Sequence, residues 1–274
     1  MARLPVIVGF GGYNSAGRSS FHHGYKRLVI ESLPVAERQK TLANLAIMMG
    51  LLTYQNDVYL DETAQSYSLQ KIEDDLSQQI LNSTLVRRIE SQYFDVDAVH
   101  WLQNLELENN DSQKSEFTLA KKALPNPLPS NWQVSELDAK QVKVAITGSL
   151  SVKIDRYREL SVKSAGQLPT GFDPAAQYKS RFHPRALQLA VLGASDAIQS
   201  IGIDWQFIMN NVEPDQIAVY SSNIMGQMDE AGLGGMMTSR LKGGRVTTKQ
   251  CPLGHNSMTA DFINAYVLGS VGST

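Results

Sequence analysis

Two residues with reactive side chains lie close together near the end of the sequence: Cys251 and, four positions later, His255. A cysteine thiolate acts as a nucleophile or a metal ligand, and a neighbouring histidine is a common base or second ligand. Cys251 is the single cysteine of the chain, and no acidic residue stands beside His255 to orient its ring. We therefore favour a loop cysteine without a catalytic role, and a nucleophile remains the alternative.

A metal site built on Cys251 and His255 would need further ligands from elsewhere in the chain. The candidates are His22, His23, His100 and His183. Only His22 and His23 are close together in the sequence, and adjacent histidines do not have the spacing typical of zinc sites. We expect no bound metal.

Glycines near the N-terminus imitate a dinucleotide-binding fingerprint. Gly9 and Gly11 have its first spacing, and Glu31 lies twenty residues beyond Gly11, where a ribose-binding acid would stand. Asn14 replaces the third glycine, however, and no helical pattern follows the turn directly. A nucleotide-binding oxidoreductase is therefore an alternative that we rank lower, and we expect no dissociable cofactor.

The composition is that of an ordinary globular protein. Hydrophobic residues make up 42% and charged residues 19% of the 274 residues, and the formal net charge is −2. No strongly basic field invites nucleic acid, and no run of eighteen apolar residues predicts a transmembrane helix. The N-terminus lacks a signal-peptide pattern, and one cysteine permits no internal disulfide. We expect a cytoplasmic protein that binds neither nucleic acid nor a membrane.

The elements that must position any site alternate between strand and helix, which predicts an α/β layered core. Apolar runs predict buried strands at residues 6–10 and 217–220, and alternation predicts two strands around a tight turn at Gly148. Helices are expected from Pro34, after an N-cap at Ser68, from 183 to 202, and from an N-cap at Asn256 to a stop at Gly269. The polar stretch 106–138, with prolines at 125, 127 and 129, predicts a loop.

Segments in a particular order resemble β-ketoacyl synthases. They are Val6–Gly12 with Ser15–Gly17, Gly171–Pro174 with the helix 183–202, Ile217–Gly226, and Asn256–Ala260, which is similar to the family's "NMAAG" helix. One departure is Ser221-Ser222-Asn223, where the family has a glycine-rich turn. The resemblance implies a thiolase-like α/β fold, of which residues 1–21 and 140–274 form the N-terminal half. Residues 22–139 would be a mostly helical insertion like that of a longer bacterial subfamily.

The resemblance also implies an activity: the decarboxylative Claisen condensation of malonyl-acyl carrier protein with an acyl thioester. The family's nucleophilic cysteine and its histidines would lie beyond Thr274, so we expect no catalytic residue in these 274 residues and no activity from them alone. Ile224 and Met225 match residues that border the acyl chain, and ordinary core packing is their alternative reading.

The partners that the resemblance implies are an acyl carrier protein, the malonyl and acyl thioesters, the C-terminal half of the same enzyme, and a second copy in a homodimer. A second hypothesis remains open: the chain is a non-catalytic partner in a synthase assembly, like the chain-length-factor subunits of the family.

Overall fold

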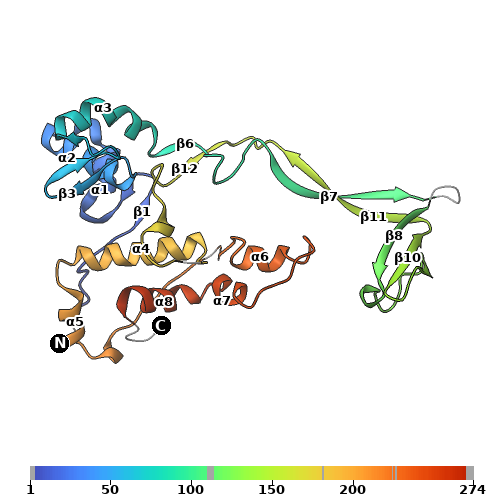
Figure 1. Cartoon of the computed structure of the whole chain (residues 1–274). Coiled ribbons are helices and arrows are strands. Elements are labelled where there is room, and N and C mark those ends of the chain that lie inside the picture. Colours follow the sequence, from blue (N-terminus) through green and yellow to red (C-terminus); the bar gives the residue numbers. More distant parts are fainter. Residues whose placement is uncertain (1–3, 110–113, 181, 224, 226, 270–274) are drawn as a thin grey trace. The chain divides into compact units, whose positions relative to one another are not determined.

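The structure is a computed structural model that describes residues 4–109, 114–180, 182–223, 225 and 227–269. The chain forms two compact units (Figure 1). The first is built from the described residues up to Arg88 and from Ser164 onward, and the second spans Ile89–Lys163. The first unit is mainly helical and the second consists mainly of strands.

The first unit opens with a tight hairpin. Strand β1 (Tyr13–Asn14) pairs antiparallel with β2 (Gly17–Arg18), and the Asn14 side chain accepts a hydrogen bond from the backbone of Ala16 at 2.8 Å. Gly17 has φ +106°, a conformation that favours glycine. The hairpin is not the strand-to-helix turn of a dinucleotide fingerprint, so the structure does not support the oxidoreductase alternative.

Two helices and a small sheet follow the hairpin and enclose an apolar core. After the short helix α1 (His23–Leu28), α2 (Val35–Met48) begins behind Pro34, and the Ser68 hydroxyl caps α3 (Leu69–Asn82), as predicted. Between α2 and α3 lie β3 (Thr53–Gln55), β4 (Val58–Leu60) and β5 (Ser66–Tyr67), an antiparallel sheet in the order β3-β4-β5. The buried core comprises Ile30, Leu42, Ala43, Leu45, Ala46, Met49, Leu52, Ile72 and Ile80.

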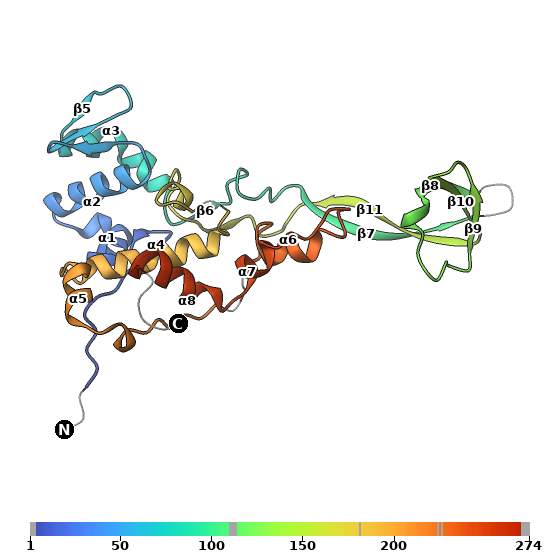
Figure 2. The same ribbon diagram turned by 60° about the horizontal axis from the view of Figure 1, so that its bottom comes forward.

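The rest of the first unit is built around the sixteen-residue helix α4 (Arg185–Ser200), which confirms the helix expected from 183 to 202. The other helices are α5 (Trp205–Asn211), α6 (Leu233–Thr238), α7 (Gln250–Gly254) and α8 (Met258–Ile263), which continues as a π-helical turn, Asn264–Leu268. Helix α8 packs against α4 (Figure 2) and ends at Gly269, as predicted. Its N-cap is Ser257 rather than Asn256, one residue later than expected.

None of these described helices is by itself a candidate membrane span. In the described part of the chain, no one helix is long and apolar enough to cross a membrane. Helices α4 and α5 reach that length and composition only when taken together, and they are bent by 80°.

The second unit consists of a long ribbon and a small sheet. Strands β7 (Val99–Glu108) and β11 (Ser149–Arg158) pair antiparallel along ten residues each. Strands β8 (Ser115–Ala120), β9 (Trp132–Glu136) and β10 (Gln141–Ile146) form a sheet in the order β8-β10-β9. Val142, Val144 and Ile146 on β10 are its buried core, packed against Phe117 and Trp132. In the first unit, β6 (Val86–Arg88) pairs with β12 (Ser164–Gly166).

Three expectations about the middle of the chain are wrong. The predicted loop 106–138 contains β8, β9 and the end of β7, because alternate side chains such as Phe117 and Leu119 pack onto β10. The two strands around Gly148 form but belong to different sheets, because Gly148 (φ +74°) leads from β10 into the ribbon. Residues 22–139 are also not mostly helical, since strands predominate after Asn82.

The compact units divide at residues 88–89 and 163–164. This division does not test the bounds 21–22 and 139–140 expected between the family core and its insertion. Whether 22–139 is an insertion relative to shorter members of the family stays a prediction.

Neither of the two apolar runs expected to be buried strands is buried: 6–10 is largely exposed, and 217–220 alternates between partly exposed and exposed side chains. Residues 6–10 belong to no strand, and the side chain of Ile7 is 88% exposed. Residues 217–220 have a single bridge position, at Ala218, and the ring of Tyr220 is 95% exposed. A β-branched run forms a buried strand only where neighbouring strands pair with it and cover its faces. The described residues provide no such neighbours for these two runs.

Exposed apolar side chains in these runs favour association. We expect the 274-residue chain to bind a hydrophobic dye and to form oligomers, and Val8→Lys with Tyr220→Lys to reduce both. Gln216→Lys is the matched control, because it adds a lysine in the same region without removing apolar surface. Dye fluorescence and sedimentation velocity measure the two effects. A dye-silent monomer would show that these runs do not drive association.

Candidate functional site

The predicted acyl-pocket residues lie in the segment between α5 and α6. Ile224 lies outside the described residues, and the Met225 side chain is 74% exposed. Their role in binding an acyl chain therefore stays a prediction.

A buried glutamine connects this segment to α8. Gln227 is fully buried, and its amide donates to the hydroxyl of Thr259 at 3.4 Å while accepting from the Asn223 amide at 3.5 Å. Thr259 is itself buried in α8. A buried amide that is bonded on both sides is costly to displace. The Gln227–Thr259 contact therefore holds the backbone next to Met225 against the helix that resembles the family's "NMAAG" segment.

Cys251 lies in helix α7 and not in the loop expected for it, because residues 250–254 form a short helix. Cys251 is exposed within α7, and His255 contacts the hydroxyl of Ser257 through Nδ1 at 2.8 Å. Among the described residues, no group of three or more histidine, cysteine or carboxylate side chains could hold a metal ion. Among the described residues, Cys251 makes no hydrogen bond to a base, and its lack of a catalytic role stays a prediction.

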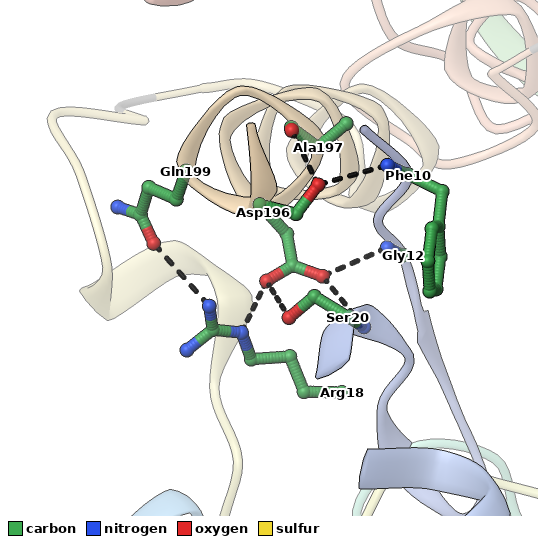
Figure 3. Close-up of polar contacts among 8 residues, drawn as sticks. Phe10, Gly12, Arg18, Ser20, Asp196, Ala197 and Gln199 are labelled. Atoms are coloured by element: carbon green, nitrogen blue, oxygen red, sulfur yellow. Dashed lines mark hydrogen bonds and ion pairs between the residues drawn. The ribbon is translucent and has the colours of Figure 1, made fainter. Parts of the chain in front are cut away.

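The most extensive polar centre of the first unit surrounds Asp196 on α4 (Figure 3). The side chain is buried, and its Oδ2 accepts hydrogen bonds from the backbone amides of Gly12 at 3.1 Å and Ser20 at 3.2 Å. Its Oδ1 accepts from the Ser20 hydroxyl at 2.7 Å and forms an ion pair with Arg18. A buried carboxylate is tolerated only when its charge and lone pairs are satisfied in this way.

Two further contacts extend this centre along α4. The Ser200 hydroxyl accepts from the backbone amide of Phe10 at 2.8 Å and donates to the carbonyl of Ala197 at 2.7 Å. The Arg18 guanidinium also donates to Gln199 Oε1 at 3.4 Å (Figure 3). Backbone from residues 10–12 therefore lies directly on the helix.

A glycine makes this close approach sterically feasible. A Cβ at Gly11 would come within 2.2 Å of the Ala197 backbone nitrogen, a distance that real Cβ atoms do not adopt. Gly11 is thus required for packing, and not for the pyrophosphate contact that a dinucleotide fingerprint would give it.

Sequence reasoning missed this centre. Asp196 lies on the side of the predicted helix opposite its apolar stripe, where a charged residue usually faces solvent. The identity of its partners, Arg18 and Ser20, depends on contacts across more than 170 positions of sequence. Only the tertiary structure reveals them.

A partly buried aromatic cluster around His183 lies where the start of α4 meets α8 and the π-helical turn. His183 contacts the Tyr178 hydroxyl through Nδ1 at 2.9 Å, and its ring packs edge-on against Phe262 and Tyr266 at centroid distances of 4.8 and 4.9 Å. Burial lowers the pKa of His183, and burial raises the pKa of Tyr178 to about 12. Both groups are therefore uncharged near neutral pH, and their contact is a neutral hydrogen bond that orders the cluster.

The Asp196 centre yields a stability prediction. Asp196→Asn removes the charge that balances Arg18 and replaces one acceptor by an amide that cannot accept. We expect the free energy of unfolding to fall by about 2–4 kcal/mol. This range is lower than the cost of breaking a fully buried ion pair, because Arg18 is partly exposed. Gln199→Ala is the control on the same helix, with an expected change within about 0.5 kcal/mol. Urea unfolding measures both, and equal stability of the two variants would contradict the assignment.

Comparisons with known proteins place these features in context. The chain is 57% identical over all 274 residues to the β-ketoacyl-[acyl-carrier-protein] synthase FabY of Pseudomonas aeruginosa. It matches the crystal structure of the noncanonical ketosynthase FabY from P. aeruginosa with a TM-score of 0.88, over 100% of this chain. No family model matches. The chain spans 43% of the length of this relative, so less than half of the relative is compared. The resemblance to a ketosynthase is therefore confirmed, and the whole chain is similar to the N-terminal half of such an enzyme.

Proposed function

We propose that this chain supplies the N-terminal part of a β-ketoacyl-[acyl-carrier-protein] synthase of fatty-acid synthesis. The observation that carries the proposal is the 57% identity to a ketosynthase over every residue of the chain. A polypeptide this similar, with a TM-score of 0.88 against the ketosynthase structure, shares the backbone that positions the parent chemistry. The mixed helices and strands of the first unit are consistent with one half of a thiolase-like α/β core.

The proposed reaction is the condensation of malonyl-acyl carrier protein with an acyl thioester, with loss of carbon dioxide. An acyl group first moves from its carrier thioester to a cysteine thiolate, which releases the carrier thiol. The carbanion left by decarboxylation of malonyl-acyl carrier protein then attacks the acyl carbonyl and expels the cysteine thiolate. The thiolate is best formed at a helix N-terminus or beside a base. Cys251 does stand in the first turn of α7, but this helix has only five residues, the thiol is exposed, and its neighbour His255 contacts Ser257. We therefore place the catalytic groups outside these 274 residues.

The proposed partners follow from the reaction and from the exposed apolar surface. An acyl carrier protein delivers both thioesters, and the remaining part of the enzyme covers the apolar runs at 6–10 and 217–220. A homodimer is the proposed assembly, and the cytoplasm the proposed location. Residues 22–139 are proposed as the insertion that distinguishes this protein from shorter ketosynthases.

The activity is tested with the full-length protein. We expect it to form β-ketoacyl product from malonyl-acyl carrier protein, and Cys251→Ala to change the rate by no more than about twofold, because Cys251 is not the nucleophile. The 274-residue chain alone should form none. Mass spectrometry of the carrier-bound product measures all three. Loss of activity in Cys251→Ala, or product from the isolated chain, would refute the assignment of the nucleophile.

The proposed acyl pocket is tested by changing the size of a side chain. We propose that Met225, with Ile224, borders the acyl chain in the complete enzyme. Met225→Trp should then shift the preference toward shorter acyl thioesters, because one added methylene in an apolar pocket alters kcat/KM by roughly tenfold or more. Met237→Trp is the matched control, since Met237 is also exposed but lies on α6. Equal chain-length profiles for the two variants would exclude Met225 from the pocket.

A further inference from the structure

A cavity of about 540 Å³ lies in the first unit between the N-terminal hairpin and α2, away from Met225 and Cys251. This volume is within the range that holds a small organic ligand. Its lining residues are Tyr13, Arg18, Ser20, Phe21, His23, Lys26, Glu37, Lys40, Thr41, Asn44, Ile47, Met48, Phe172 and Gln177. They combine cationic and apolar side chains, and nothing in the proposed condensation uses them.

Positive charge exceeds negative charge at the cavity. Arg18 is paired with buried Asp196, and Lys26 with Glu37. The hydrogen bond and the charge of Lys26 lower the pKa of Glu37, as does the more distant charge of Lys40. Lys40 is exposed on α2 and has no ion-pair partner within the described structure. Three cations thus face two carboxylates, and Lys40 is the cation left without a partner of its own.

An incompletely satisfied histidine lies at the same place. His23 lines the cavity, and its Nδ1 is buried without a hydrogen-bond partner among the described residues. Burial, followed by the charges of Arg18 and Lys26, lowers the pKa of this imidazole, while Asp196 acts in the opposite direction. A buried polar atom without a partner is costly, and such sites are often completed by a ligand or water. An anion in the cavity would also offset the local excess of positive charge.

Other residues of the cavity lining are apolar or aromatic. Tyr13 stacks on Phe172 with a centroid distance of 5.1 Å and an interplanar angle of 9°. Ile47 and Met48 on α2 add aliphatic surface, and Phe21 contributes a largely exposed ring. Such a surface suits the carbon skeleton of a ligand and not only its charged group.

The backbone between hairpin and α1 is strained next to this surface. Phe21 and His22 have φ values of 51° and 57°, in the left-handed region that residues other than glycine rarely adopt. The bonds of Ser20 to Asp196 hold the chain immediately before them. Strain of this kind persists where surrounding contacts over-determine the backbone, and it is concentrated at binding sites. The strained residue Phe21 is itself part of the cavity lining.

We propose that this cavity binds a small organic anion, with its carboxylate or phosphate group near Lys40 and Lys26 and its apolar body against Phe21 and Met48. The site is separate from the proposed acyl pocket. Its occupancy does not depend on whether the chain belongs to an active ketosynthase, so the two proposals succeed or fail independently.

The charge requirement is tested by isothermal titration calorimetry on the full-length protein, with phenyl phosphate, phenylacetate and benzyl alcohol as probes. We expect saturable binding of at least one of the two anions at or below about 10 mM, and none of the uncharged alcohol at that concentration. Whichever anion binds more tightly identifies the head group. Lys40→Ala should weaken the binding roughly three- to fivefold, the effect of one exposed ion pair. Lys242→Ala, an exposed lysine outside the cavity, should leave it unchanged.

The apolar requirement is tested with Phe21→Ala and inorganic phosphate. Phe21→Ala should weaken the binding of the preferred aromatic probe and leave the much weaker binding of inorganic phosphate unaltered. Circular dichroism of each variant establishes that it folds. The proposal is overturned if neither anion binds saturably, if Lys40→Ala and Lys242→Ala bind alike, or if benzyl alcohol binds as tightly as the anions.

Discussion

The buried carboxylate of Asp196 is the interaction on which the arrangement of the first unit depends. It accepts hydrogen bonds from Gly12 and Ser20 and forms an ion pair with Arg18. One side chain of α4 therefore holds the hairpin and the turn that follows it. Without these partners a charge at that depth would cost several kcal/mol, and without the charge the buried amides would lack acceptors. The carboxylate can therefore be buried only with the hairpin segment in place, and the hairpin segment needs the carboxylate as its hydrogen-bond acceptor.

The contacts of Asp196 affect two other parts of the first unit. Nearby, they press residues 10–12 onto α4 so closely that Gly11 has no space for a side chain. Further along the chain, they determine where α1 begins and therefore where His23 and Lys26 stand at the cavity. The polar centre at Asp196 thus helps to position residues that line the cavity.

The proposed function and the exposed apolar runs have a common physical basis. A relative with 57% identity is more than twice as long as this chain, since the chain spans 43% of it. Apolar runs such as 6–10 and 217–220 are stable as strands only beside other strands. Their exposure here, together with the segment around Met225, marks surface that we propose the remaining polypeptide covers in the complete enzyme.

Much of the local structure follows from the sequence alone. The helical periodicity and the caps are local properties of neighbouring residues in α2, α3, α4 and the end of α8. The order of the motifs along the chain, from Val6 to Ala260, indicated the resemblance to a ketosynthase. The tertiary structure decided what depends on distant partners: the pairing of β10 with β8 and β9 instead of β11, and the lack of sheet at 217–220. It also decided the convergence of Arg18, Ser20 and Asp196. Sequence patterns report which faces of an element are apolar, but the partner that buries each face or balances each charge is chosen across the whole fold.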